Sequence, residues 1–287
     1  FEETGQAPVG TRWVDVNKGG DLNLEYRSRL VAQELKRLSW ADDLFAATPP
    51  IEALKSVLSL LATDNRGRSL MINDVKRAFS NAKCRRDVYV AIPEEDRRPG
   101  DEDLCGKLQW SLYGTRDAAQ NWYLEYSSTL VSIGFSQGTA SPCVFRHEER
   151  DLTTYVHGDD YVSAVVPSDL KWLKEKLEKH YEIKTEVLGP REDELKEVRV
   201  LNRIIRWTEH GLAYEADPRH VEIPCSQLKL GDCNSVSSPG TKEEGTTKTD
   251  CAEELDQNQA SSFRALAARC NYLATDRPDI AYSTKEL

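Results

Sequence analysis

The chain of 287 residues is long enough for one large domain or two modest ones. Its hydrophobic content of 39% and charged content of 30% are typical of a globular protein, and no apolar run approaches the roughly 20 residues of a spanning helix, so no membrane partner is expected. The net charge of −10 disfavours nucleic acid binding unless basic residues are gathered locally.

Cysteine usage and the chain ends add two expectations. The seven cysteines are an odd number, and no two are spaced C-x-x-C. This pattern disfavours a zinc ribbon or a disulfide framework and favours a reducing compartment. The chain does not begin with Met and stops abruptly after residues 282–287. Both ends are therefore expected to be cuts in a longer chain.

The first third of the chain predicts strands and one helix. Residues 11–36 alternate like two strands around a turn at residues 18–21. Thr48-Pro49-Pro50 predicts a helix start, because apolar residues follow at helical spacing. Two short apolar strands are predicted next, at residues 71–75, where the chain carries Asp74, and at residues 87–92.

The middle of the chain predicts two helices around a β-hairpin. The helices are expected at residues 118–133, closed by Gly134, and at residues 168–181. Between them, the β-rich runs at 153–156 and 161–166 flank His157-Gly158-Asp159-Asp160. This pattern indicates a hairpin with acids at its tip.

The last third predicts a second hairpin, a linker and a helix. The hairpin is expected from strands at residues 198–207 and 212–214. Residues 234–260 are polar and predict a mobile linker, and residues 261–273 predict a helix. Strands and helices intermixed with hairpins indicate an α+β fold around an antiparallel sheet.

Carboxylates at two places in the chain are the candidate catalytic residues: Asp74 on its strand, and Asp159-Asp160 at the hairpin tip. Nucleotidyl transfer needs carboxylates that hold two Mg²⁺ ions about 4 Å apart. If the acids serve that purpose, the Asp74 and Asp159 carboxylates should lie within roughly 4–7 Å of each other. The alternative is ordinary turn chemistry, since aspartates are common in turns.

Motifs along almost the whole chain then resemble one family. Tyr26–Ala32 resembles Y-K-A-R-L-V-A, Phe45–Pro50 resembles F-A-P-V-A, Asn73–Ala82 resembles Q-x-D-V-x-x-A-F-L-N-G, Asp87–Pro93 resembles E-V-Y-M-x-x-P, Leu108–Tyr123 resembles L-x-K-A-L-Y-G-L-K-Q-A-P-R-x-W-Y, and Tyr272–Ile280 resembles Y-L-x-x-T-R-P-D-I. In this order and spacing, they are similar to the copia-type reverse transcriptase of long-terminal-repeat retrotransposons.

The resemblance implies a fold, an activity and partners. It implies the fingers and palm of a right-hand polymerase, with an antiparallel palm sheet and packed helices, over residues 1–233. Residues 234–260 would be a linker, and residues 261–287 the start of a connection towards an absent RNase H domain. The implied activity is RNA- and DNA-directed DNA synthesis from dNTPs with two Mg²⁺ ions. The implied partners are an RNA template, a DNA primer and the rest of a Pol polyprotein, including integrase and RNase H, in a cytoplasmic virus-like particle.

The resemblance also implies residue roles. Asp74 and Asp159 would be metal ligands with the Val75 carbonyl, and Asp160 would be the second acid of the hairpin. The backbone amides of Arg77 and Ala78 would face the triphosphate, as would the side chains of Arg27 and Arg29. Phe79 would exclude a ribose 2′-hydroxyl, and Lys184 would donate a proton to pyrophosphate. The alternative for Phe79 is a core aromatic, and for the two arginines an exposed strand face.

Two departures from the family pattern bear on these roles. The family's Y-V-D-D is His157-Gly158-Asp159-Asp160 here, and its Q-A-P-R is Asp117-Ala118-Ala119-Gln120. Asp117 places a negative charge where incoming phosphates are expected, unless a neighbour such as Arg116 pairs with it. A divergent branch and a decayed element both fit such changes.

A basic stretch could still bind nucleic acid. From Arg66 to Arg86 the chain has seven basic residues and a single acid. These residues are expected to line one cleft with Arg27, Arg29 and the acids, where they would neutralise phosphates. The rival readings are a catalytically inactive relic that retains a nucleic-acid-binding palm fold, and an unrelated α+β domain with chance acids.

Overall fold

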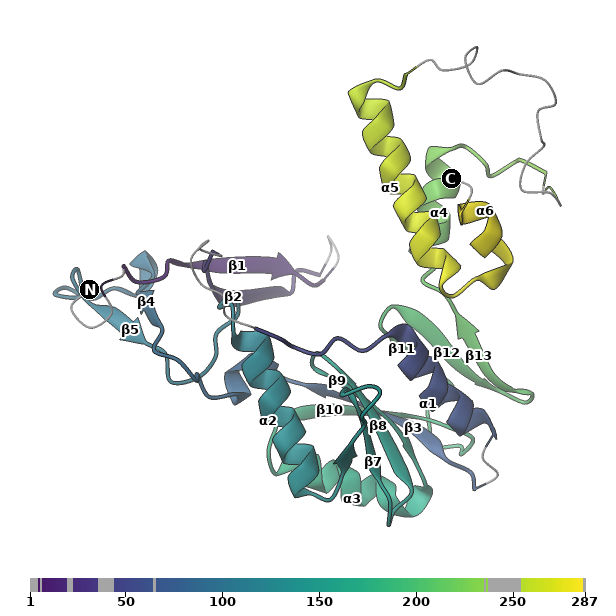
Figure 1. The fold of residues 1–287 in the computed structure, drawn as a ribbon, viewed down its shortest axis with the longest axis horizontal. Coiled ribbons are helices and arrows are strands. Elements are labelled where there is room, and N and C mark those ends of the chain that lie inside the picture. The colour runs from purple at the N-terminus through teal and green to yellow at the C-terminus, as the bar shows by residue number, and fades with distance from the viewer. Residues whose placement is uncertain are drawn as a thin grey trace. The chain divides into compact units, whose positions relative to one another are not determined.

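The structure is a computed structural model that describes residues 5, 7–19, 23–35, 44–63, 66–234, 236 and 254–285 (Figure 1). It divides into two compact units, Phe1–Glu194 (unit 1) and Leu195–Leu287 (unit 2). Most of the predicted linker at 234–260 lies outside the described residues. Within those residues, no helix combines the length and apolar character needed to span a membrane.

Unit 1 is built on a six-stranded sheet in which neighbouring strands run antiparallel, in the order β10-β3-β9-β8-β7-β6 (Figure 1). The strands are β3 (Ser69–Val75), β6 (Ser136–Gln137), β7 (Val144–His147), β8 (Leu152–His157), β9 (Asp160–Val165) and β10 (Ile183–Leu188). β3 lies second from one edge, between β10 and β9. Its central position explains why six of its seven residues are buried.

Helices pack against this sheet. The main core joins α2 (Ala118–Ser132) and α3 (Pro167–Glu178) to one face of the sheet through apolar side chains that include Trp122, Leu173 and Val156. α1 (Ile51–Thr63) contacts β3, β8 and β9 through its own buried stripe of Leu54, Val57, Leu58 and Leu61. Burial of these apolar side chains is the main source of stability for the sheet.

Two hairpins complete unit 1. β1 (Thr11–Asn17) pairs with β2 (Tyr26–Ala32) in a sheet of their own, and β4 (Tyr89–Ala91) pairs with β5 (Cys105–Lys107) in another (Figure 1). The short helices η1 (Ala78–Asn81) and η2 (Glu94–Asp96) follow β3 and β4. The Ala32 amide donates to the Tyr113 carbonyl at 2.7 Å, so the β1–β2 hairpin is tied to the segment before α2.

Unit 2 combines a small sheet with helices. Its strands pair antiparallel in the order β11 (Glu197–Val200), β12 (Arg203–Thr208) and β13 (Gly211–Glu215). The helices are α4 (Arg219–Gln227), α5 (Gln257–Ala274), η3 (Pro278–Ile280) and α6 (Ala281–Lys285). α5 begins at a capping box formed by Asp256 and Gln259, a standard way to satisfy the free amides of a helix start.

The mixed α+β class and its antiparallel sheets confirm the predicted fold class. The predicted helix after Pro50 is α1, and the predicted closure of α2 by Gly134 is also confirmed: Gly134 has φ +102°, and the Phe135 amide donates to the Leu130 carbonyl. One prediction was wrong. Residues 198–207 are two strands, because Leu201 and Asn202 both have positive φ and form a tight turn.

Candidate active site

Asp74 is the one exposed residue of β3. Alternate residues of a strand share a face, so Asp74 lies on the same face as Leu70 and Ile72. Those two side chains are buried, whereas the Asp74 carboxylate reaches solvent near the end of the strand. A strand this well packed holds the carboxylate more rigidly than a loop would.

Asp159 and Asp160 come from the tight turn between β8 and β9. β8 ends at His157 and β9 begins at Asp160, which leaves Gly158 and Asp159 as a two-residue connection. Gly158 has φ +62°, a left-handed conformation that glycine adopts without strain. The hairpin with acids at its tip is therefore confirmed.

The register of the sheet brings Asp74 close to Asp159 and Asp160. Asp74 on β3 is the direct partner of Asp160 on β9, and the Val75 amide donates to the Asp159 carbonyl at 2.9 Å. One carboxylate oxygen from each of Asp74, Asp159 and Asp160 can be chosen so that all three lie within 4.8 Å of one another. The expected proximity of Asp74 and Asp159 is confirmed, although 85 positions separate them in the sequence.

Burial and the neighbouring carboxylates shift the protonation of two of the three acids, Asp160 and Asp74. Burial, followed by the charges of Asp159 and Asp74, raises the pKa of Asp160 to about 6. Burial and Asp159 also raise the pKa of Asp74, and Arg27 and Lys184 lower it in part. This excess of negative charge on hard oxygen donors suits a cation such as Mg²⁺, which prefers carboxylate ligands.

The chain turns sharply after β3, at the residues expected to face a triphosphate. Arg77 adopts a left-handed conformation, with φ 53° and ψ 45°, directly before η1. The Asn81 side chain fixes this turn by donating to the Lys76 and Arg77 carbonyls at 3.1 Å each. Ala78 is the first residue of η1, and the first amides of a helix have no carbonyl partner within that helix.

Phe79 lies half-buried on η1, at the edge of the main core. Its ring centroid is 4.7 Å from that of Tyr113, and the Arg29 guanidinium lies 5.5 Å from the centroid of the same Tyr113 ring. Sequence reasoning gave Tyr113 no role, although it stands in the quoted L-Y-G motif. The structure thus brings Phe79 and Arg29 together around one aromatic ring.

Electrostatics also link this group to the acids. Burial and the charge of Asp159 raise the pKa of the Tyr113 hydroxyl, and Arg29 and Arg27 oppose that shift. Arg27, which is exposed on β2, likewise opposes the raised pKa of Asp74. Arg27 and Arg29 are two residues apart on one strand, so their side chains share a face.

Lys184 lies beside the acids on β10, where it is the direct partner of Asp74. Its ammonium group donates to the Glu186 carboxylate at 2.7 Å, and Glu186 and then Asp74 raise the pKa of Lys184. Lys184 is therefore a charged neighbour of Asp74 on the side opposite β9.

The basic stretch from Arg66 to Arg86 is not one cleft surface, and this prediction was wrong. Arg68 is fully buried and, like Arg66, pairs with Asp151. Lys76 and Arg77 both pair with Glu182, and Arg86 pairs with Glu34 and Asp117. Among the basic residues of the stretch, Lys83 and Arg85 are exposed and form no ion pair with the described part of the chain. Local carboxylates neutralise the others.

Asp117 is paired, but not by the expected residue. Arg86 binds its carboxylate at 2.8 Å, whereas Arg116 donates its backbone amide to Glu34. Asp117 is buried and also accepts a hydrogen bond from Asn121 at 3.0 Å. Its charge is therefore committed within the protein.

Trp122 is a further residue that sequence reasoning missed as part of the site. Its indole Nε1 donates to the Gly158 carbonyl at 2.7 Å, directly before Asp159. Trp122 matches the tryptophan of the family's R-x-W-Y pattern, which could have pointed to a role in the site, but a buried aromatic residue on a helix is usually only a core residue. Here it also holds the acidic turn from α2.

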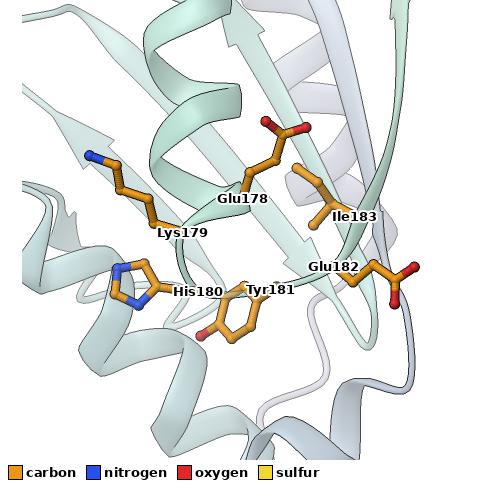
Figure 2. A pocket seen from close by; sticks show the side chains of 6 residues that line it. All are labelled: Glu178, Lys179, His180, Tyr181, Glu182 and Ile183. Atoms are coloured by element: carbon orange, nitrogen blue, oxygen red, sulfur yellow. The ribbon is translucent and has the colours of Figure 1, made fainter.

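A pocket of about 410 Å³ lies at the end of α3, and none of the three acids is among its lining residues (Figure 2). Its lining is the connection between α3 and β10, residues 178–183. Tyr181 is engaged through a hydrogen bond to Thr129 at 2.8 Å, and Glu182 through the ion pairs to Lys76 and Arg77.

Comparison with known proteins agrees with this site. The family described as "Reverse transcriptase (RNA-dependent DNA polymerase)" matches residues 2–195, which cover almost all of unit 1 and include the three acids. The Pol polyproteins of transposon TNT 1-94 from Nicotiana tabacum and of transposon RE1 from Arabidopsis thaliana are 25% and 26% identical, each over 97% of this chain.

The chain spans about a fifth of the length of those relatives, 21% and 19% respectively. The Gag-Pol polyprotein of transposon Ty1-DR4 from Saccharomyces cerevisiae is 28% identical over 50% of this chain and 9% of its own length. The family match covers more than half of the chain, and the plant relatives are retrotransposon polyproteins. The chain belongs to the reverse transcriptase (RNA-dependent DNA polymerase) family and is of the copia retrotransposon type.

Proposed function

We propose that this chain is the RNA- and DNA-directed DNA polymerase of a copia-type retrotransposon, and that it extends a DNA primer on a template with dNTPs. One observation carries the proposal: carboxylates from β3 and from the β8–β9 turn meet within 4.8 Å. Such a cluster on rigid elements is what nucleotidyl transfer requires. In this proposal the six-stranded sheet with α2 and α3 is the palm, and the β1–β2 hairpin belongs to the fingers.

The acids would hold the metal. Asp74, Asp159 and the Val75 carbonyl would bind two Mg²⁺ ions, which when bound activate the primer hydroxyl and neutralise the triphosphate charge. Asp160 would add negative charge beside them. Its pKa is raised to about 6, so a bound cation would favour the ionised form of Asp160.

Other residues would bind and orient the nucleotide. Arg27 and Arg29 would donate charge-assisted hydrogen bonds to the triphosphate, together with the amides of Arg77 and Ala78. Phe79 would limit the space beneath the sugar. Lys184, the register partner of Asp74 with a raised pKa, would supply a proton to the pyrophosphate leaving group.

The partners and boundaries are part of the same proposal. The template would be RNA or DNA, and the rest of the Pol polyprotein, with its integrase and RNase H, would act alongside in a cytoplasmic virus-like particle. The free thiols of the six cysteines in the described residues suit such a reducing compartment. Residues 1–233 would be the fingers and palm, 234–260 a linker, and 261–287 the start of a connection towards RNase H.

Primer extension tests the proposal. The wild-type chain, a primed template, dNTPs and Mg²⁺ should give incorporation, and Asp159→Asn should lower it by at least about 100-fold. The matched control is Asp103→Asn, an exposed aspartate on the loop before β5, which should leave incorporation unchanged. Melting temperatures of both variants check that the fold is intact.

Two results would contradict the proposal in different ways. Incorporation that survives in Asp159→Asn would remove this residue as a metal ligand. A folded wild-type chain that binds primed template but incorporates nothing, where a control polymerase works, would favour the inactive relic.

A further inference from the structure

Three charged side chains meet at the junction between the β1–β2 hairpin and α2. The Arg86 guanidinium donates through Nη1 and Nη2 to the two Glu34 carboxylate oxygens, at 2.8 and 2.5 Å. Nη2 also donates to the Asp117 Oδ1 at 2.8 Å. The Asp117 and Glu34 side chains are only 4% and 14% exposed. A planar guanidinium that bridges two carboxylates is a strong and geometrically specific contact.

Both carboxylates accept one further hydrogen bond each. Glu34 Oε2 accepts the Arg116 amide at 2.8 Å, and Asp117 Oδ2 accepts the Asn121 amide group at 3.0 Å. Burial alone would raise the pKa of Glu34 and of Asp117, but the hydrogen bonds and charge of Arg86 leave both values lowered. Both carboxylates are therefore hydrogen-bonded within the protein, although the buried Arg86 Nε has no hydrogen-bond partner among the described residues. This arrangement fits a structural role rather than substrate binding.

The two carboxylates stand on different parts of the proposed active site. Glu34 lies two residues beyond the end of β2, the strand that carries Arg27 and Arg29. Asp117 directly precedes α2, whose residue Trp122 holds the Gly158 carbonyl beside Asp159. Arg86 thus joins the strand of the arginines to the helix that holds the acidic turn.

We propose that Arg86, by bridging Glu34 and Asp117, is a positioning residue that fixes the Arg27–Arg29 strand over the acids and so sets the affinity for dNTP. The inference rests on the proposed polymerase function. A strand ordered in advance avoids the entropy cost of ordering it on each binding event. This proposal also accounts for Asp117 at the position where the family pattern has glutamine, because the aspartate binds Arg86 instead of facing the nucleotide.

The test variant is Arg86→Lys, which keeps the positive charge but loses the planar fork that spans both carboxylates. In steady-state primer extension, the KM for dNTP should rise about tenfold while kcat changes less than about threefold. Hydrogen exchange of backbone amides in Tyr26–Ala32 should become faster in the free protein. Asp117→Asn, a second variant of nearly unchanged shape, should move both readouts in the same direction.

The matched control is Glu194→Gln. Glu194 is 4% exposed and holds Arg191 and Ser69, the first residue of β3, far from Asp74 along that strand. This change should lower the melting temperature without altering the dNTP KM or the exchange of Tyr26–Ala32. It therefore separates loss of a buried charge from loss of positioning.

The possible outcomes distinguish this inference from the proposed function. If the wild-type chain incorporates no nucleotide, the polymerase function fails, and hydrogen exchange still tests the bridge without activity. Unchanged exchange in folded Arg86→Lys and Asp117→Asn would overturn the positioning role. Faster exchange with an unchanged dNTP KM would overturn the link to nucleotide affinity.

Discussion

Asp160 bears much of the repulsion that arises when three carboxylates gather at one end of the sheet. It is half-buried, and its pKa is raised to about 6 by burial and by Asp159 and Asp74. The folded state therefore binds this proton more tightly than the unfolded state, in which an aspartate titrates near 3.9. Stability contributed by the protonated form is present below about pH 4 and is lost as the pH rises through about 6.

Asp160→Asn should therefore stabilise the metal-free protein at pH 8 and have little effect at pH 4. After allowance for screening by solvent, the expected gain in unfolding free energy is on the order of 1–2 kcal/mol. Urea unfolding in EDTA at the two pH values measures it, with Asp103→Asn as the control. A destabilised variant at pH 8 would contradict the assigned repulsion.

Phe79 tests sugar selection at a single residue. Its half-buried ring packs against Tyr113, so shortening it opens space beside the proposed nucleotide site. Phe79→Val should raise rNTP use relative to dNTP use, by on the order of 1–3 kcal/mol in discrimination. Parallel kinetics with dNTP and rNTP measure the ratio, and thermal melting measures the fold.

If Phe79 is only a core residue, the result differs. The variant should then lose about 1–3 kcal/mol of stability through reduced burial, with an unchanged rNTP to dNTP ratio. That outcome would remove Phe79 from the nucleotide site.

At the scale of single residues, local sequence patterns predict some site residues, but they do not predict hydrogen-bond networks between residues far apart in the sequence. The acid cluster was predictable, because β-rich runs flank Gly158-Asp159-Asp160 and a short apolar strand carries Asp74. The bridge of Glu34, Arg86 and Asp117 was not, because no periodicity or turn chemistry connects three positions so far apart. Asp117 alone suggested a missing cation, and the nearest candidate in sequence was the wrong one.

Among the described helices, α2 is the one whose side chain is hydrogen-bonded to the acidic turn, and the residue before it binds Arg86. Asp117 precedes its first turn, and Trp122 holds the Gly158 carbonyl at 2.7 Å. The Gly158–Asp159 turn is otherwise held through the backbone bond from Val75 to Asp159. The position of the turn thus depends on both a strand and a helix.

Trp122→Phe should loosen the turn while it preserves most of the aromatic packing. Loss of this part-buried hydrogen bond should cost about 0.5–1.5 kcal/mol of stability, and kcat should fall further than stability alone explains. The control is Tyr181→Phe, which removes the 2.8 Å hydrogen bond to Thr129 in the same core. Equal kcat losses in the two variants, measured at matched folded fractions, would refute a specific role for the turn.

Helices were predicted correctly where apolar periodicity agreed with a proline or glycine at the helix end. The prediction failed at a turn between strands that contains no glycine. α1 follows Pro50 and α2 is closed by Gly134, as the sequence indicates. The turn between β11 and β12 uses Leu201 and Asn202 at positive φ, a conformation that is rare for leucine. Asn202 is a residue type that adopts positive φ readily, but Leu201 is not, so the pair did not mark a turn and two strands were predicted as one.

For the whole molecule, the strength of nucleic acid binding should depend on how many basic side chains are not already paired with carboxylates of the protein. The chain carries a net charge of −10, and ion pairs to Asp151, Glu182, Glu34 and Asp117 occupy five basic residues of the Arg66–Arg86 stretch. Nearness in sequence misled the prediction here, because Arg68 and Lys76 flank opposite ends of β3, which are roughly 20 Å apart.

Nucleic acid binding should therefore depend on few phosphate contacts, with Lys83 and Arg85 among them. Each contact contributes about 0.9 to the slope of log affinity against log salt concentration. The double variant Lys83→Ala/Arg85→Ala should make that slope shallower by about 1–2, because two phosphate contacts are lost. Arg66→Ala is the matched control: its partner is Asp151, so the slope should not change. Fluorescence anisotropy of a labelled primer–template between roughly 50 and 200 mM salt measures all three proteins. An equal change of slope in Arg66→Ala would show that this arginine exchanges Asp151 for phosphate, and the binding surface would then extend to both ends of β3.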